Sequence, residues 1–86
     1  MQFITTIKIN EGKFGDAIKL FKHPRLLDEI KIQCFLGVFG DCDAVIIFEA
    51  PSESAAVEFV SLFQSVAKTQ TSLVFPVSEY RLTSHT

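Results

Sequence analysis

The chain has 86 residues, which is room for one domain, and a domain of this size buries only about 60–65 % of the surface that its unfolded chain exposes. Apolar residues make up 48 % of it and include nine Phe, which excludes a disordered chain. The formal net charge of −2 argues against a nucleic-acid partner, and apolar runs of at most six residues are far below the roughly 20 needed to cross a bilayer, so we expect no membrane partner.

A strand and an amphipathic helix are predicted first. Alternation of side chains and a high content of β-branched residues indicate the strand. The residues expected on one of its faces are Phe3, Thr5, Ile7 and Ile9. It ends at Asn10-Glu11-Gly12. Apolar residues then recur at helical spacing, with charged ones turned outward: Phe14, Ala17, Ile18 and Phe21 against Lys13, Asp16, Lys19 and Lys22.

The helix is expected to stop or kink at Pro24, which cannot donate a backbone hydrogen bond and biases His23 away from helical dihedrals. Leu26, Leu27 and Ile30 indicate a further short helical piece.

Two apolar runs, Cys34 to Phe39 and Ala44 to Phe48, predict a hairpin with a two-residue turn at Gly40-Asp41. In that register Cys42 pairs with Phe39 and Cys34 lies opposite Ile47. The two cysteines are then too far apart for a disulfide, so we expect reduced thiols, with Cys34 in the core and Cys42 more exposed. One face would hold Phe35, Gly37, Phe39, Ala44, Ile46 and Phe48, and the other Leu36, Val38, Val45 and Ile47.

A second helix and a last strand follow. Ser52 is a good N-cap after Ala50-Pro51, and Glu53 suits the positive end of the helix dipole. The buried stripe of this helix is predicted to be Ala56, Phe59, Val60 and Phe63. Residues Thr69 to Val77 are strand-like, with Pro76 near an edge or a strand end.

The element order is therefore βαββαβ, which predicts a ferredoxin-like α+β fold with a four-stranded antiparallel sheet and two helices on one face. Residues 1–82 form the single expected domain and residues 83–86 a frayed tail. Because the helices cover one sheet face only, the second apolar face would lie in water. We therefore expect a homodimer with two-fold symmetry and face-to-face sheets, or a higher even-numbered oligomer.

The charges are unevenly placed. Six of the eight Lys and Arg residues lie between Lys8 and Lys31, whereas the stretch from Ile32 to Ala67 holds five acidic residues and no basic one. Two solvated faces would explain this pattern. The alternative is that the basic first helix steers a partner or an anionic ligand. The first residues lack the basic and then apolar pattern of a signal peptide, so we expect a cytoplasmic protein.

Two segments resemble the GYD domain family, which is named for a glycine, a tyrosine and an aspartate in its hairpin. They run from Gly40 to Pro51, beginning Gly-Asp-Cys-Asp, and from Phe75 to Tyr80. The tyrosine of the family falls on Cys42, so no role of its ring or hydroxyl carries over to this chain.

The family belongs with the dimeric α/β-barrel proteins, and its hairpin is similar to the effector-binding domain of leucine-responsive transcription regulators. The resemblance implies dimerisation through the sheets and binding of amino acids or related small molecules near an interface. It makes Gly40, Asp41 and Asp43 the candidate ligand-binding residues. The chain has no room for a helix-turn-helix part, so it would be a stand-alone module.

Gly40-Asp41 is read first as a turn. The functional alternative is that Asp41 and Asp43 gather the ammonium group of a zwitterionic ligand, whose carboxylate would be held by backbone amides or by a partner-chain Lys or Arg. Two Asp residues without a third ligand do not define a metal site, so we expect no metal. His23 is interpreted as an exposed helix-end residue. No phosphate loop, nucleophile elbow or zinc-ligand spacing is present, so we expect no catalytic residue and no cofactor.

Two classes of function remain open. The first is a non-enzymatic oligomer that binds or senses a small amino-acid-like metabolite. The second is a small cofactor-free barrel enzyme, resembling monooxygenases or isomerases that act on apolar or aromatic substrates. A buried cavity that reaches His23, Asp43 or Tyr80 would favour the enzyme, and a filled sheet interface would disfavour it. We favour the binding module because the acids and the glycine cluster at one hairpin. A scaffold assembled through strand edges is a third alternative.

Overall fold

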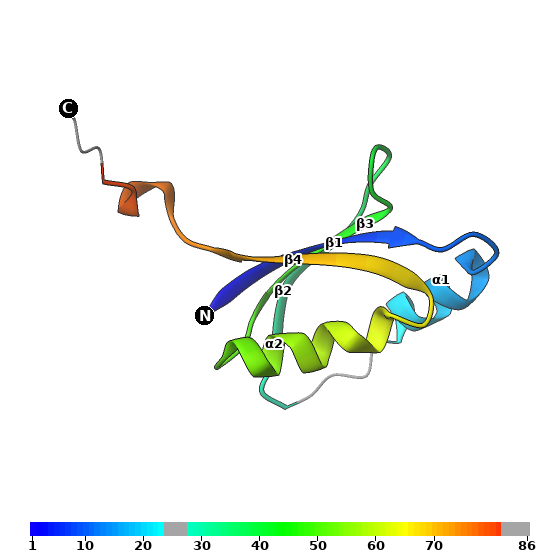
Figure 1. Cartoon of the computed structure of the whole chain (residues 1–86), viewed down its shortest axis with the longest axis horizontal. Coiled ribbons are helices and arrows are strands. Elements are labelled where there is room, and N and C mark those ends of the chain that lie inside the picture. Colours follow the sequence, from blue (N-terminus) through cyan, green and yellow to red (C-terminus); the bar gives the residue numbers. More distant parts are fainter. Residues whose placement is uncertain (24–27, 82–86) are drawn as a thin grey trace.

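The computed structural model describes residues 1–23 and 28–81 of the chain. Its strands and helices confirm the predicted βαββαβ order and the ferredoxin-like α+β fold: β1 (Gln2–Ile9), α1 (Phe14–Lys22), β2 (Lys31–Gly37), β3 (Ala44–Glu49), α2 (Glu53–Val60) and β4 (Ala67–Val74). The strands form one antiparallel sheet in the order β2-β3-β1-β4. Both helices lie on the same side of this sheet (Figure 1). We call the opposite side the open face.

The inner strand β1 has the predicted alternation. Phe3, Thr5 and Ile7 are buried on the helix side, and Thr6 and Lys8 face the open side. After β1 the chain turns through Gly12, whose φ of 78° lies in the left-handed region that glycine adopts at little cost. The Lys13 N–H donates to the Asn10 carbonyl oxygen at 3.0 Å and closes this turn.

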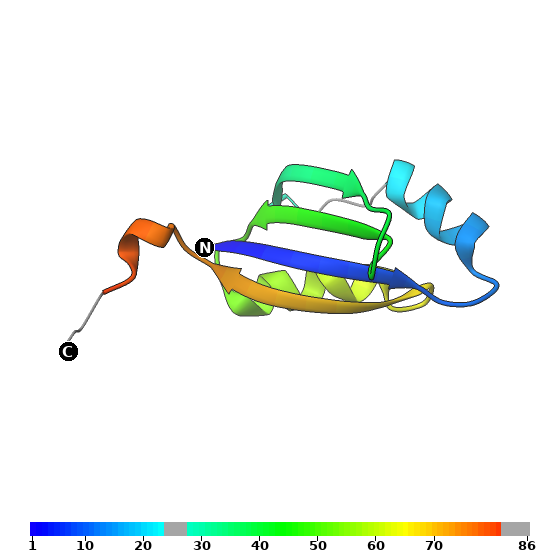
Figure 2. The ribbon, with the colours of Figure 1, turned by 90° about the horizontal axis from the view of Figure 1, so that it is seen from above.

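Helix α1 lies at the end of the sheet, whereas α2 runs along it (Figure 2). Ala17 is buried, and the Phe21 ring lies 5.2 Å from the Phe35 ring. Phe14 was predicted in the buried stripe, but it is 63 % exposed because the first turn of α1 extends past the strands. The helix ends before Pro24, as expected. The further helical piece predicted around Leu26 and Leu27 lies outside the described residues.

The β2–β3 hairpin has the predicted register and a wider loop. Cys34 lies opposite Ile47, as expected. The Val38 N–H donates to the Asp43 carbonyl oxygen at 3.0 Å. Hydrogen-bonded and non-bonded pairs alternate along an antiparallel ladder, so the pair beyond Val38 and Asp43 is a non-bonded one. The loop is therefore formed by the four residues 39–42, in place of the predicted two-residue turn. Phe39, expected on the face of Phe35, is therefore at the loop and 109 % exposed.

Both cysteines are free thiols, as predicted, but their exposure is the reverse of the prediction. Cys34 is exposed and Cys42 is half-buried. Cys34 lies on the open face because its partner Ile47 alternates with the buried Ile46 and Phe48. Its strand β2 is also at the edge of the sheet. Cys34 is therefore no core residue of this chain.

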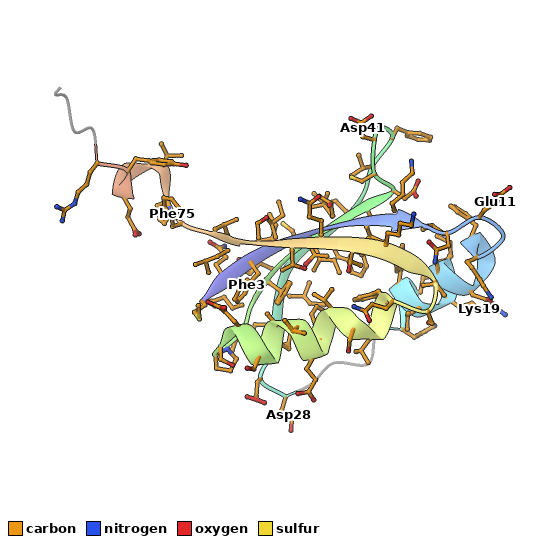
Figure 3. The ribbon with its side chains drawn as sticks, in the orientation of Figure 1. Phe3, Glu11, Lys19, Asp28, Asp41 and Phe75 are labelled. Atoms are coloured by element: carbon orange, nitrogen blue, oxygen red, sulfur yellow. The ribbon has the colours of Figure 1, made fainter. Side chains whose placement is uncertain are left out.

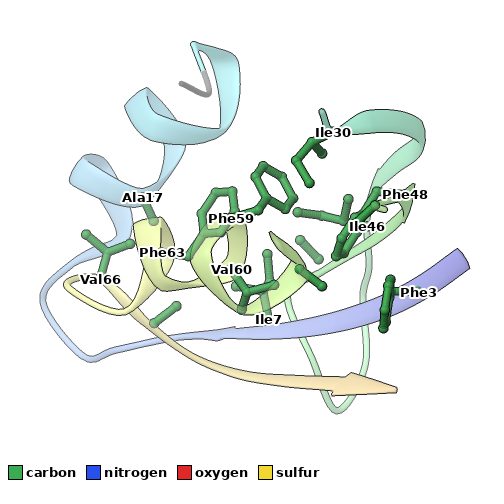
Figure 4. Close-up of a cluster of buried hydrophobic side chains, with 14 residues drawn as sticks. Phe3, Ile7, Ala17, Ile30, Ile46, Phe48, Phe59, Val60, Phe63 and Val66 are labelled. Atoms are coloured by element: carbon green, nitrogen blue, oxygen red, sulfur yellow. The ribbon is translucent and has the colours of Figure 1, made fainter. Parts of the chain in front are cut away.

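The second helix agrees with the sequence at its cap and its buried stripe. The Ser52 hydroxyl oxygen accepts a hydrogen bond from the Ala55 N–H at 3.1 Å. Helix α2 continues into the 3-10 turn η1 (Ser61–Phe63). The predicted stripe residues Ala56, Phe59, Val60 and Phe63 are all buried. They meet the sheet in one apolar cluster, in which the Phe59 ring lies 4.9 Å from the Phe48 ring (Figure 4).

The last strand begins and ends earlier along the chain than predicted. It spans Ala67–Val74, not Thr69 to Val77, and Pro76 follows it. The chain then leaves the body of the protein through the 3-10 turn η2 (Val77–Glu79), as Figure 2 shows. We call residues 75–81 the C-terminal arm. Its exposed apolar side chains are Phe75, Val77 and Tyr80. The predicted tail, 83–86, lies outside the described residues.

Within the two described ranges, neither helix has the length and apolar character that crossing a membrane would require.

Candidate functional site

Two pockets flank the base of the hairpin loop, one on each side of the sheet. An apolar pocket of about 640 Å³ lies on the helix side, between α1 and the β2–β3 hairpin. A polar pocket of about 420 Å³ lies on the open face, beside the ends of β1 and β4. Asp43 lines the apolar pocket and Asp41 lines the polar one. The two acids that the sequence grouped therefore belong to different sites.

The apolar pocket is lined by α1, by the β2–β3 hairpin with its loop, and by the end of β1. Helix α1 supplies its inner face, and the hairpin supplies the opposite wall. The apolar lining consists of Ile9, Phe14, Ile18, Phe21, Phe35 and Val38, with Phe39 at the loop and Gly37 and Ala44 at the strand ends. The charged residues among the lining are Lys22 and Asp43. A mostly apolar concavity with a few polar groups is the usual form of a small-molecule site.

Asp43 is held at the base of the loop by two backbone hydrogen bonds. Its own N–H donates to the Ile7 carbonyl oxygen at 2.8 Å. Its carboxylate oxygen Oδ2 accepts from the Ile9 N–H, also at 2.8 Å. The carboxylate thus substitutes for a strand partner at Ile9, just before β3 begins. An ionised carboxylate has about four acceptor positions, so Asp43 retains capacity for a ligand.

Lys22 is a site residue that the sequence analysis missed. The helical pattern placed it on the outward face of α1, with Lys19. It lines the apolar pocket because it lies in the last turn of α1, next to Phe21, whose ring packs against that of Phe35. The signal that could have found it is its position four residues after Ile18, which places both side chains on the same side of the helix.

Gly40 and Asp41 lie at the tip of the loop, which projects from the open face (Figure 3). Both are exposed. The Lys8 ammonium donates to the Asp41 backbone carbonyl oxygen at 3.3 Å, so Lys8 supports the loop. Gly40 lines neither pocket. The tip therefore brings Asp41 to the polar pocket and leaves Gly40 with its role as a turn residue.

Two other residues considered for catalysis are exposed and are not part of the lining of the apolar pocket. His23 is exposed at the end of α1, and Tyr80 is in the C-terminal arm, with its ring 5.0 Å from that of Phe75. Neither lines the pocket. In the part of the chain that the structure describes, no three His, Cys, Asp or Glu side chains gather as metal ligands.

No family model matches this chain, and no curated protein matches it in sequence.

Proposed function

We propose that this protein is a homodimeric module that binds a small amino-acid-like metabolite with an apolar side chain, and that it is a divergent relative of the GYD domains. The observation that carries the proposal is the apolar pocket, in which one acid and one base are the charged residues among apolar walls.

The pocket chemistry matches a zwitterion. Asp43 would accept from the ammonium group of the ligand, and Lys22 would donate to its carboxylate. Charge-assisted hydrogen bonds of this kind are shorter and stronger than neutral ones. The apolar part of the ligand would pack on Phe21 and Phe35. The volume of about 640 Å³ is within the usual range of small-molecule sites, about 300–1,000 Å³.

The open face supports the homodimer. It carries Ile4, Val45, Ile47 and Val74, all half-buried, and Leu36, which is 56 % exposed. An apolar sheet face of this kind usually marks an interaction site. The C-terminal arm, which projects from the body (Figure 2), adds three exposed apolar side chains. A second copy would cover both surfaces with one isologous contact.

One observation favours the alternative of a cofactor-free enzyme with an apolar or aromatic substrate: Asp43 reaches the apolar pocket. General acid–base catalysis needs a carboxylate that is free to move a proton and a partner that positions it. The Oδ2 atom of Asp43 is already bonded to the Ile9 N–H. The pocket is also bordered by strongly exposed side chains, such as Phe14 and Phe39, and is no closed cavity. The binding module therefore fits better.

The test is a panel of apolar amino acids in thermal shift and isothermal titration calorimetry. Each amino acid is compared with its N-acetyl form, which lacks the ammonium group, and its amide form, which lacks the carboxylate. We expect the free amino acid to raise Tm and both modified forms to bind at least about tenfold more weakly, because each loses a charge-assisted hydrogen bond.

Variants assign the two ends of the ligand. Asp43→Asn keeps an acceptor for the Ile9 N–H while removing the charge, so it should fold and should lose the preference for the free amine. Lys22→Gln should lose the preference for the free carboxylate. Lys19→Gln is the matched control, since Lys19 points outward from α1 (Figure 3). Equal binding by all three variants and the parent would contradict the site.

Native mass spectrometry of the freshly purified protein tests the assembly. An even-numbered oligomer would support the homodimer, and extra mass on it would give the mass of a bound ligand. A monomer at micromolar concentration would contradict the homodimer.

A further inference from the structure

The polar pocket on the open face has a separate chemistry that the proposed function does not use. Its lining includes Thr6 and Lys8 from β1, Lys68 and Gln70 from β4, and Asp41 and Cys42 from the hairpin loop. The loop rises beside these strand ends (Figure 1), and its residues Asp41 and Cys42 line one side of the pocket.

Two of the lysines are direct neighbours across the sheet. Lys8 lies opposite Lys68 in the β1–β4 register, so both side chains leave the sheet on the same face, with Cβ atoms about 4.5–5.5 Å apart. Like charges placed directly opposite each other destabilise a sheet. An anion that binds between the two ammonium groups would offset this repulsion and so stabilise the folded protein.

Protection of an exposed strand edge does not explain the pair. Lysines on edge strands discourage pairing with other chains, and this would account for Lys68 on the edge strand β4. Lys8 is on β1, which lies between β3 and β4. Its position on an inner strand calls for another reason.

The neighbouring groups are also suited to an anion. Thr6 lies opposite Gln70. This pair is on the same face as the lysine pair and two residues from it along the strands, so a hydroxyl and an amide N–H₂ lie beside the two ammonium groups. Lys8 uses one of its three N–H donors on the neutral Asp41 carbonyl oxygen, at 3.3 Å, and keeps its charge. Asp41 adds one negative charge at the rim, so the side chains of the pocket retain a net positive charge.

The geometry points to an oxyanion site at this pocket: a carboxylate or phosphate group of a small molecule bridges the Lys8 and Lys68 ammonium groups and accepts further hydrogen bonds from Thr6 and Gln70. Such a group has two or three oxygen atoms, so it can accept from both lysines at once. The site is on the opposite side of the sheet from the apolar pocket and is independent of it.

The test is NMR titration of the ¹⁵N-labelled protein with inorganic phosphate and, separately, with acetate, each against chloride at the same ionic strength. We expect saturable shifts at the amides of residues 6–8, 41–42 and 68–70. A response to phosphate alone identifies a phosphate group, and a response to acetate alone identifies a carboxylate. Equal responses to chloride and to both oxyanions would overturn the site.

Lys68→Gln should weaken binding of the effective anion about tenfold, because one charge-assisted partner is lost. Without anion the same variant should have a higher Tm than the parent, since the repulsion between the two lysines is removed. Lys19→Gln removes one positive charge on α1 and should bind the anion as the parent does. An unchanged dissociation constant in Lys68→Gln would overturn the site, and this result would leave the apolar pocket unaffected.

Discussion

The Thr5 hydroxyl oxygen lies 2.7 Å from the Thr71 hydroxyl oxygen, and the contact joins β1 to β4 on the helix side of the sheet. Thr5 is the buried polar residue of the described core, with an exposed fraction of 0 %. A buried hydroxyl costs free energy unless it is hydrogen-bonded. The Thr71 hydroxyl therefore allows a polar side chain to stay in an apolar core.

Thr71→Val should lower the free energy of unfolding by about 1–3 kcal/mol, because it leaves the buried Thr5 hydroxyl without this partner. Thr5→Val/Thr71→Val should be more stable than Thr71→Val alone, since the orphaned hydroxyl is then removed as well. Urea denaturation of the two single variants and the double variant measures both effects. Strict additivity of the single effects would contradict a coupled pair.

Phe48→Ala should lower the free energy of unfolding by about 3–5 kcal/mol, because it opens a cavity in the core. Phe48 is fully buried, with its ring 5.6 Å from Phe3 and 4.9 Å from Phe59. Val57→Ala on the exposed side of α2 is the control and should change stability by no more than about 0.5 kcal/mol. Both are measured at one protein concentration, since dissociation of an oligomer shifts apparent stability.

Ser52→Ala should lower the free energy of unfolding by about 1 kcal/mol, because the Ala55 N–H loses its cap. Ser54→Ala, in the exposed first turn of α2, is the matched control and should be close to neutral. Thermal denaturation followed by circular dichroism compares the two. A loss in Ser54→Ala as large as that in Ser52→Ala would contradict a specific capping effect.

Leu36→Asp should dissociate the proposed homodimer, because it places a charge on the apolar open face, on the edge strand β2, where a partner would desolvate it. Analytical ultracentrifugation should show a folded monomer. Val57→Asp adds the same charge on the opposite side of the molecule and should leave the dimer intact. If Leu36→Asp remains dimeric, the open face is not the interface.

The fold was readable from the sequence because its signals are local. Alternation along β1, the Ser52 cap and the stripe of α2 depend on spacing within one element, and each is confirmed. The hairpin register was also predictable, since Cys34 opposite Ile47 follows from counting outward from the turn. The predicted loop length was wrong. The register decides which residues lie opposite each other, but the alternation of bonded and non-bonded pairs decides which of these pairs is hydrogen-bonded and therefore where the loop begins.

The misplaced residues share a different cause. Phe14 and Cys34 belong to apolar patterns, and both are exposed. A pattern states which side of an element a residue occupies, and only the packing of elements decides whether that side is covered. Phe14 is beyond the end of the sheet, and Cys34 is on the open face of an edge strand.

The chemistry of the two pockets was decided by tertiary structure. The sequence placed Asp41 and Asp43 two residues apart and grouped them, but the loop sends them to opposite sides of the sheet. Lys22 comes to Asp43's pocket, and Lys8 comes opposite Lys68, from positions 21 and 60 residues away along the chain. The sequence by itself determined the strands, the helices and their order, because these depend on the periodicity of neighbouring side chains. Only the folded chain decided which charges share a pocket, because that depends on how strands pair and where a loop leaves the sheet.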